Sequence, residues 1–189
     1  PGKKNEILIN LTNRGKEDLA DLSVFYSSSV FNLEDKLSLN KFQKKTIKFN
    51  LEVDPLTEKG EYILSIRLFK DGRIKGNKDF KFNVGENLNL NEKNIVSNGF
   101  LSAKVEIVRE NKGNIDIKRE VSYPIGSFQR FFTKTSPIGR FVRDEEGMRY
   151  EWEFNVAPGS VYKITNVTDY KWLFVSIVVI LLAIIAVIY

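Results

Sequence analysis

The side chains that most often carry out acid–base and metal chemistry are missing from this sequence. Its 189 residues contain no histidine and no cysteine. Without them there is no Ser-His-Asp triad, no Cys-His dyad, no histidine or thiolate metal site and no disulfide framework. We therefore expect no catalytic, cofactor-binding or metal-binding residues and no bound cofactor, and so a protein that is not an enzyme.

Carboxylates are the remaining candidates for chemistry. Residues 144–146 form an acidic run, and Glu151 and Glu153 follow it. Paired carboxylates can hydrolyse glycosides or bind calcium. However, the two glutamates alternate with Tyr150, Trp152 and Phe154 in the sequence YEWEF, which predicts a strand with Trp152 in the core and the glutamates on the solvated face. No DxDxDG calcium loop occurs, so we expect neither activity.

The most unusual polar stretch, residues 127–143, interleaves phenylalanines with basic residues. The residues concerned are Phe128, Phe131, Phe132 and Phe141, together with Arg130, Lys134, Arg140 and Arg143. Two interpretations are open. In one, the phenylalanines complete a hydrophobic core beneath an irregular loop. In the other, the segment is a contact surface, where rings supply area and basic groups attract anionic lipid or another partner.

Two tripeptides match the acceptor pattern for N-linked glycosylation. They begin at Asn10 and Asn166, each followed two residues later by threonine. Asn10 follows Ile9 in an alternating segment, so its side chain is expected to face solvent. Glycosylation of Asn10 or Asn166 would require an extracytoplasmic location.

The last 18 residues, Trp172 to Tyr189, contain no charged side chain. As a helix this run would be roughly 27 Å long, close to the hydrocarbon thickness of a bilayer. Tyr170 and Trp172 at one end and Tyr189 at the other suit the two interfacial belts. A buried core helix is the competing interpretation, but a polar face is absent. Residues 170–189 therefore predict a single transmembrane anchor that binds the lipid bilayer.

The first half of the chain has the pattern of an antiparallel sandwich. Apolar residues alternate with polar ones in five segments: 5–13, 19–26, 44–53, 60–69 and 79–84. Asn13-Arg14-Gly15 and Asp71-Gly72 supply turns between such segments. Short alternating strands separated by turn signals favour a β-sandwich over residues 1–86.

The second half repeats this pattern after a polar stretch, which predicts a linker at residues 87–94. Strands are expected at 103–108, 115–123, 149–156 and 161–167. Asn-x-Gly turns at 13–15 and 111–113 lie 98 residues apart, close to the length of an immunoglobulin-type sandwich. The expected fold is all-β: tandem immunoglobulin-like β-sandwiches at 1–86 and 95–169, followed by one C-terminal transmembrane α-helix.

Charge is spread evenly along the chain. The net charge is +5; residues 1–86 carry 16 basic and 13 acidic side chains, and residues 87–171 carry 13 and 11. A nucleic-acid binder concentrates positive charge on one lobe, so no nucleic-acid partner is expected. The chain begins with Pro1-Gly2, not with Met, which is consistent with a processed chain or a fragment.

The strand, Asn-x-Gly turn and strand at the start resemble the CARDB-type immunoglobulin-like domains of bacterial and archaeal envelope proteins. ENKGN at 110–114, YEWEF at 150–154 and APGS at 157–160, before a C-terminal apolar helix, resemble membrane-anchored surface proteins built from such modules. Residues 124–143 depart from that pattern, being longer and more aromatic than a turn needs. The resemblance implies no catalytic motif and domains outside the cytoplasm.

The resulting hypothesis is a non-enzymatic, envelope-anchored adhesion or scaffold module, with a protein or a surface glycan as its partner. Two alternatives stay open. One is an accessory subunit of a membrane complex that positions a partner, and the other is a membrane-anchored carbohydrate-binding module.

Overall fold

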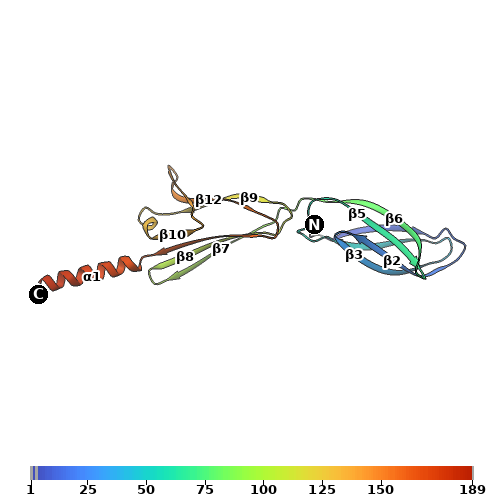
Figure 1. Cartoon of the computed structure of the whole chain (residues 1–189), viewed down its shortest axis with the longest axis horizontal. Coiled ribbons are helices and arrows are strands. Elements are labelled where there is room, and N and C mark those ends of the chain that lie inside the picture. The colour runs from blue at the N-terminus through green and yellow to red at the C-terminus, as the bar shows by residue number, and fades with distance from the viewer. Residues whose placement is uncertain (1, 3, 189) are drawn as a thin grey trace. The chain divides into compact units, whose positions relative to one another are not determined.

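A computed structural model describes residue 2 and residues 4–188 (Figure 1). It confirms a chain made of β-sheets with one C-terminal apolar helix. The chain forms two compact units, which we call the first and second sandwich. The first comprises the chain up to Leu88 with Gly113–Ile115, and the second comprises Asn89–Lys112 and the chain from Asp116 onward.

The described part of the first sandwich contains six strands in two sheets. They are β1 (Lys4–Thr12), β2 (Leu19–Ser28), β3 (Phe31–Leu39), β4 (Lys44–Glu52), β5 (Gly60–Lys70) and β6 (Arg73–Val84). Strands β1 and β4 form one sheet, and the other has the order β3-β2-β5-β6. This matches the B–E pair and the C′-C-F-G order of an immunoglobulin-type sandwich. All pairings are antiparallel.

The core of the first sandwich follows the alternation of its strands. Ile9, Ile47, Leu22 and Val24 are buried between the two sheets, while their chain neighbours face outward. Strand β3 was not predicted, because only its last residues follow the pattern: of the residues before Leu37, Phe31 alone is partly buried against the core. An edge strand that is buried at one end has too little hydrophobic periodicity to be recognised in sequence.

The described part of the second sandwich contains seven strands in two sheets. They are β7 (Leu90–Gly99), β8 (Ser102–Asn111), β9 (Ile117–Pro124), β10 (Thr133–Ser136), β11 (Arg140–Asp144), β12 (Gly147–Val156) and β13 (Val161–Asp169). The sheet orders are β10-β13-β8-β7 and β11-β12-β9. A short 3₁₀ helix, η1 (Gln129–Phe132), precedes β10. The core contains Ile107, Trp152, Phe154, Val156 and Ile164.

The predicted linker at residues 87–94 is wrong at its C-terminal end. Strand β7 begins at Leu90 and pairs with β8 along its whole length. Its pattern is almost entirely exposed, and only Leu90 and Ile95 are partly buried. Because β7 is a polar edge strand, it is indistinguishable from a loop by hydrophobicity alone.

The two Asn-x-Gly turns, which lie 98 residues apart, make equivalent backbone hydrogen bonds in the two sandwiches. The N–H of Asn13, just after β1, donates to the carbonyl of Gln43 (2.9 Å). The N–H of Asn111, at the end of β8, donates to the carbonyl of Ser160 (3.0 Å). Gln43 and Ser160 immediately precede β4 and β13, the strands that pair with β1 and β8. The pair β8–β13 therefore occupies in the second sandwich the place of β1–β4 in the first.

The buried side-chain amides of the same two asparagines also make equivalent hydrogen bonds. We call the backbone and side-chain bonds of Asn13 and Asn111 together the asparagine device. Asn13 Nδ2 donates to the carbonyl of Leu39 at the end of β3 (3.4 Å), and Asn111 Nδ2 donates to that of Val156 at the end of β12 (2.8 Å). The partners are 26 residues apart in the first case and 45 in the second. Between the asparagine and its carbonyl partner, the second sandwich therefore has 19 more residues than the first, in the region that contains η1, β10 and β11.

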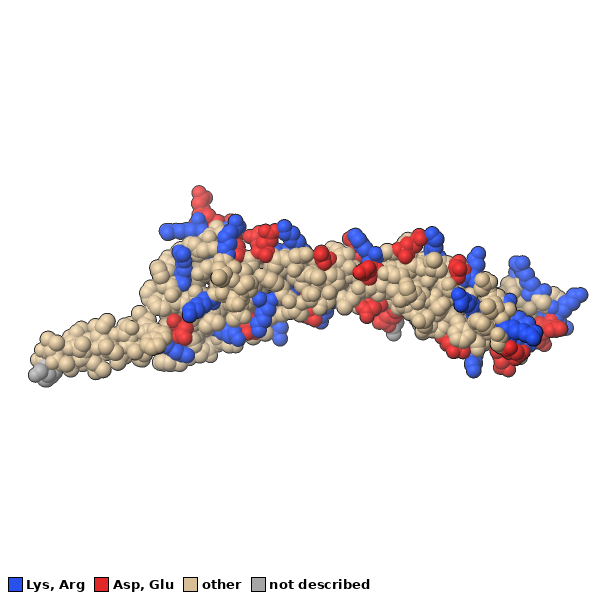
Figure 2. Space-filling model, in the orientation of Figure 1, with Lys and Arg blue, Asp and Glu red and all other residues tan. Residues whose placement is uncertain are grey.

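Helix α1 (Lys171–Ile188) forms where the anchor was predicted. Tyr189, the last residue of the predicted anchor, lies outside the described residues. None of the described residues of α1 is buried, so the helix does not pack into the core of either sandwich. Figure 2 shows α1 almost free of charged side chains, whereas both sandwiches carry interspersed basic and acidic groups. By length and composition α1 is a candidate membrane span.

Candidate contact surfaces

The predicted aromatic–basic contact segment divides into two parts in the structure. Phe128 and Phe131 are 60% and 81% exposed, while Phe132 and Phe141 are half-buried. The four basic members are exposed: Arg130, Lys134, Arg140 and Arg143. The residues around η1 lie beside the start of α1, and the residues of β11 lie against β12.

The part around η1 packs on Tyr170, the single residue between β13 and α1. The ring centroids of Phe128 and Phe132 are 5.0 Å apart, and that of Phe132 is 5.0 Å from Tyr170. Phe128 and Tyr170 are nearly parallel, with an interplanar angle of 9°. These rings therefore cluster where the chain leaves the sandwich.

Polar contacts hold η1 on the end of β13. The hydroxyls of Thr133 and Thr168 are 2.8 Å apart, and Thr168 is buried. Gln129 Nε2 donates to Thr168 Oγ1 (3.4 Å), and Thr133 Oγ1 donates to the carbonyl of Gln129 (3.0 Å). These bonds position η1, from which Phe131 projects into solvent.

The turn between β7 and β8 adds an aromatic residue that sequence reasoning missed. Phe100 is 73% exposed, and its ring meets that of Phe174 in α1 edge to face, with centroids 6.0 Å apart. The carbonyl of the next residue, Leu101, accepts a hydrogen bond from the N–H of Tyr170 (2.8 Å). In the sequence, the only sign that Phe100 is exposed is its position directly after Asn98-Gly99, a dipeptide typical of turns. We call Phe100, Phe128, Phe131, Phe132 and Tyr170 the aromatic rim.

The remaining part of the segment belongs to the body of the second sandwich. Phe141 contacts Tyr150, and the guanidinium carbon of Arg130 lies 3.8 Å from the centre of the Phe141 ring. Trp152 is buried, as predicted, and its Nε1 donates to the carbonyl of Pro137 (2.9 Å). Gly139 lies so close to this indole that a Cβ would meet it at 2.6 Å.

The prediction that Glu151 lies on a solvated strand face is wrong. Glu151 is buried beneath Arg140 and Arg149, with N–O distances of 2.6 and 2.7 Å, and Arg149 also binds Asp144. Hydrogen bonds from Arg149 and Arg140 hold the pKa of Glu151 below its ordinary value, so it remains ionised. Glu153 is exposed and pairs with Lys118. Across the described residues, no cluster of acidic side chains could hold a metal ion.

The two glycosylation tripeptides differ in accessibility. Asn10 is exposed, as expected, and its Oδ1 accepts a hydrogen bond from Thr46 (2.7 Å). Asn166 is only 2% exposed, and within the described structure both polar atoms of its side chain are enclosed without a hydrogen-bond partner. A glycan cannot reach Asn166 in the folded sandwich, which corrects the expectation for this residue.

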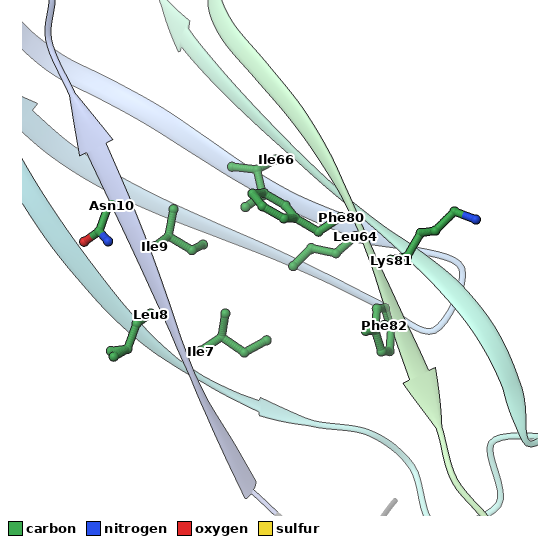
Figure 3. Close-up of a pocket in the computed structure, with 9 residues that line it drawn as sticks. All are labelled: Ile7, Leu8, Ile9, Asn10, Leu64, Ile66, Phe80, Lys81 and Phe82. Atoms are coloured by element: carbon green, nitrogen blue, oxygen red, sulfur yellow. The ribbon is translucent and has the colours of Figure 1, made fainter.

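The first sandwich has an apolar groove beside β1 (Figure 3). Its volume is about 440 Å³, and its lining comprises Ile7, Leu8, Ile9, Asn10, Leu64, Ile66, Phe80, Lys81 and Phe82. Phe80 points toward the core residues of β1 and β5 but remains 44% exposed. Within the described residues β1 pairs with β4 alone, whereas the equivalent β8 also pairs with β7. The groove therefore lies beside the edge of β1 that faces away from β4.

Comparison with known proteins finds no matching family model, no matching curated protein and no matching solved structure.

Proposed function

We propose that the chain is a non-enzymatic module that α1 anchors in a membrane, so that its two immunoglobulin-like sandwiches are held at the surface for adhesion or scaffolding. The carrying observation is α1 itself, which follows β13 after one residue and exposes its apolar side chains on all faces. Apolar surface in water costs about 25 cal/mol per Å². A bilayer removes this cost for the whole helix.

An extracytoplasmic location of the sandwiches is part of this proposal. It is supported by the resemblance to CARDB-type envelope modules and by the accessible acceptor pattern at Asn10. The test is protease treatment of intact cells together with alkaline extraction of membranes. The sandwiches should be digested from outside while α1 stays in the membrane. Domains protected on intact cells would contradict the topology, and release at alkaline pH would contradict the anchor.

The groove beside β1 favours a second candidate function, an accessory subunit that binds a protein partner. An extended strand with apolar residues at alternate positions could pair with the β1 edge and place side chains in the groove. The second sandwich fills the equivalent edge with its own β7, which supports a strand as the occupant. A carbohydrate-binding module is the remaining alternative.

Purification in mild detergent separates these candidates. A subunit should copurify with a partner at fixed stoichiometry, and Leu8→Lys, which adds a charge at the β1 edge, should abolish this. Val161→Lys is the matched control, because Val161 is also an exposed apolar strand residue. Retention of the partner by the Leu8 variant would contradict strand addition. A signal on a glycan array without a protein partner would favour the carbohydrate-binding alternative.

A further inference from the structure

We propose that the aromatic rim lies in the interfacial layer of the bilayer that α1 enters, so that the end of the second sandwich is seated on lipid. This inference rests on the proposed anchoring by α1 but goes beyond it. A sandwich can be anchored through a flexible stalk without touching the membrane. The contacts around Tyr170 exclude such a stalk here.

A single residue, Tyr170, connects the second sandwich to α1. Strand β13 ends at Asp169, and α1 begins at Lys171. Tyr170 between them donates its N–H to the carbonyl of Leu101 and accepts a hydrogen bond from the N–H of Phe174 (3.0 Å). The same residue therefore belongs to the sandwich and to the first turn of α1, which holds the turn after β7 against the helix.

The depth of α1 then sets the depth of the rim. Phe174 follows Trp172 by two residues, about 3 Å along a helix axis. If Trp172 marks the membrane–water interface, Phe174 lies at the boundary of the hydrocarbon, and Phe100 contacts it at 6.0 Å. The polar layer on each side of a bilayer is about 5–8 Å thick. Phe100 and the rings that pack on Tyr170 therefore fall within this layer.

The chemistry of the rim suits lipid. Phe131 and Phe100 are among the most exposed aromatic side chains of the second sandwich, although exposed phenylalanine is unfavourable in water. Arg130 and Lys171 are the chain neighbours of Phe131 and Tyr170, and both are exposed, as is Lys134. Basic groups near a membrane surface attract anionic headgroups by about 1 kcal/mol each. Apolar rings flanked by cations match an interfacial layer that contains anionic lipid.

The absence of native cysteine allows a direct test. Single cysteines replace Phe100, Phe131, Val161 or Ile180 in the full chain, and each carries an environment-sensitive fluorophore. The chains are reconstituted in nanodiscs of phosphatidylcholine and phosphatidylserine without any other protein. Val161 is the control, since it is 59% exposed and begins β13, the strand whose other end leads to α1. Ile180, in the middle of α1, reports on the anchor.

Probes at Phe100 and Phe131 should show blue-shifted emission and several-fold stronger quenching by headgroup nitroxide lipids than the probe at Val161, which iodide should quench instead. If iodide quenches the Phe100 and Phe131 probes as strongly as the Val161 probe while Ile180 is protected, the seating on lipid is overturned and the anchor stands. Iodide quenching at Ile180 would overturn the anchor itself. Protection of the rim that appears only after another protein is added would overturn the lipid assignment.

Discussion

The two sandwiches share four strands and differ in what is added to them. The shared pairs are β1–β4 and β2–β3 in the first sandwich, and β8–β13 and β9–β12 in the second. The first continues into β5 and β6, which extend its sheet beside β2. The second instead continues from β13 into α1, and it adds β7, β10 and β11 around the shared strands.

The second sandwich has a charged strand edge where the first continues into β5 and β6. Strand β9, the counterpart of β2, pairs with β12 alone in the described sheet, and its exposed residues include Lys118, Arg119 and Glu120. Charged edges prevent further strand pairing.

On β8, the buried Arg109 binds Asn94 (3.1 Å) and Glu92 (3.5 Å) of β7. The first sandwich leaves an apolar groove where the second has β7.

The candidate contact surfaces therefore lie where the two sandwiches differ in structure. The shared strands supply the core and the asparagine device in both sandwiches. The groove marks the position where the first sandwich lacks a strand, and part of the aromatic rim comes from the 19 additional residues of the second.

Replacing Trp152 should give the largest effect. Trp152→Ala removes the central ring of the second core and should lower the free energy of unfolding of that sandwich by about 3–5 kcal/mol. Calorimetry of the full chain in detergent should show a lower melting temperature for one transition only. The first sandwich provides the internal control. Unchanged melting would place Trp152 outside the core.

The asparagine device should contribute to the stability of both sandwiches. Asn13→Ala and Asn111→Ala each leave backbone carbonyls without their side-chain donor, at a cost of about 1–3 kcal/mol. Each variant should lower the melting transition of its own sandwich only. Chemical denaturation followed separately for the two transitions measures this. A large effect at one asparagine and none at the other would contradict the structural equivalence.

Gly139 tests whether the additional residues are fixed on the core. Gly139→Ala forces a methyl group against the Trp152 ring and should destabilise the second sandwich by about 1–3 kcal/mol. Gly126→Ala is the matched control, since its Cβ would meet only Gln129 at an ordinary 3.9 Å. Equal melting temperatures for the two variants would show that the segment around Gly139 is not held against Trp152.

Asn166 occupies a position at which the first sandwich has an aromatic residue. Phe49 pairs with Ile7, and Asn166 pairs with the equivalent Val105. Because both polar atoms of the buried Asn166 have no hydrogen-bond partner among the described residues, Asn166→Val should stabilise the second sandwich by about 1 kcal/mol or more. Thermal melting measures the gain. A loss of stability would indicate that the amide is satisfied within the core.

Acid should weaken the second sandwich through Glu151. Its folded-state pKa is lowered, so its contribution to stability is complete above its ordinary pKa of about 4.5 and is lost as the pH falls through the lower folded value. The melting temperature should therefore fall on acidification below about pH 4.5. Glu151→Gln should reduce this slope. The same slope in both chains would assign the effect to other carboxyl groups.

Local patterns were sufficient for part of the fold and of the site. Alternation predicted β1, β4 and β5 and the burial of Trp152, because a strand with one buried face repeats every second residue. An uninterrupted apolar run predicted α1, because no soluble surface can hold such a run. The phenylalanines of 127–143 were recognised, but their division between rim and core was not.

Which residues meet depends on the packing of segments that are distant in sequence. Strands β3 and β7 carry little hydrophobic periodicity, and sheet pairing places them. Glu151 is buried because Arg140 and Arg149 cover it, while Glu153 on the same face is exposed. Phe100 joins the rim through a turn and a helix that are far apart in sequence. Periodicity reports the side of a strand on which a residue lies, whereas the elements that cover that side depend on how distant segments pair and pack.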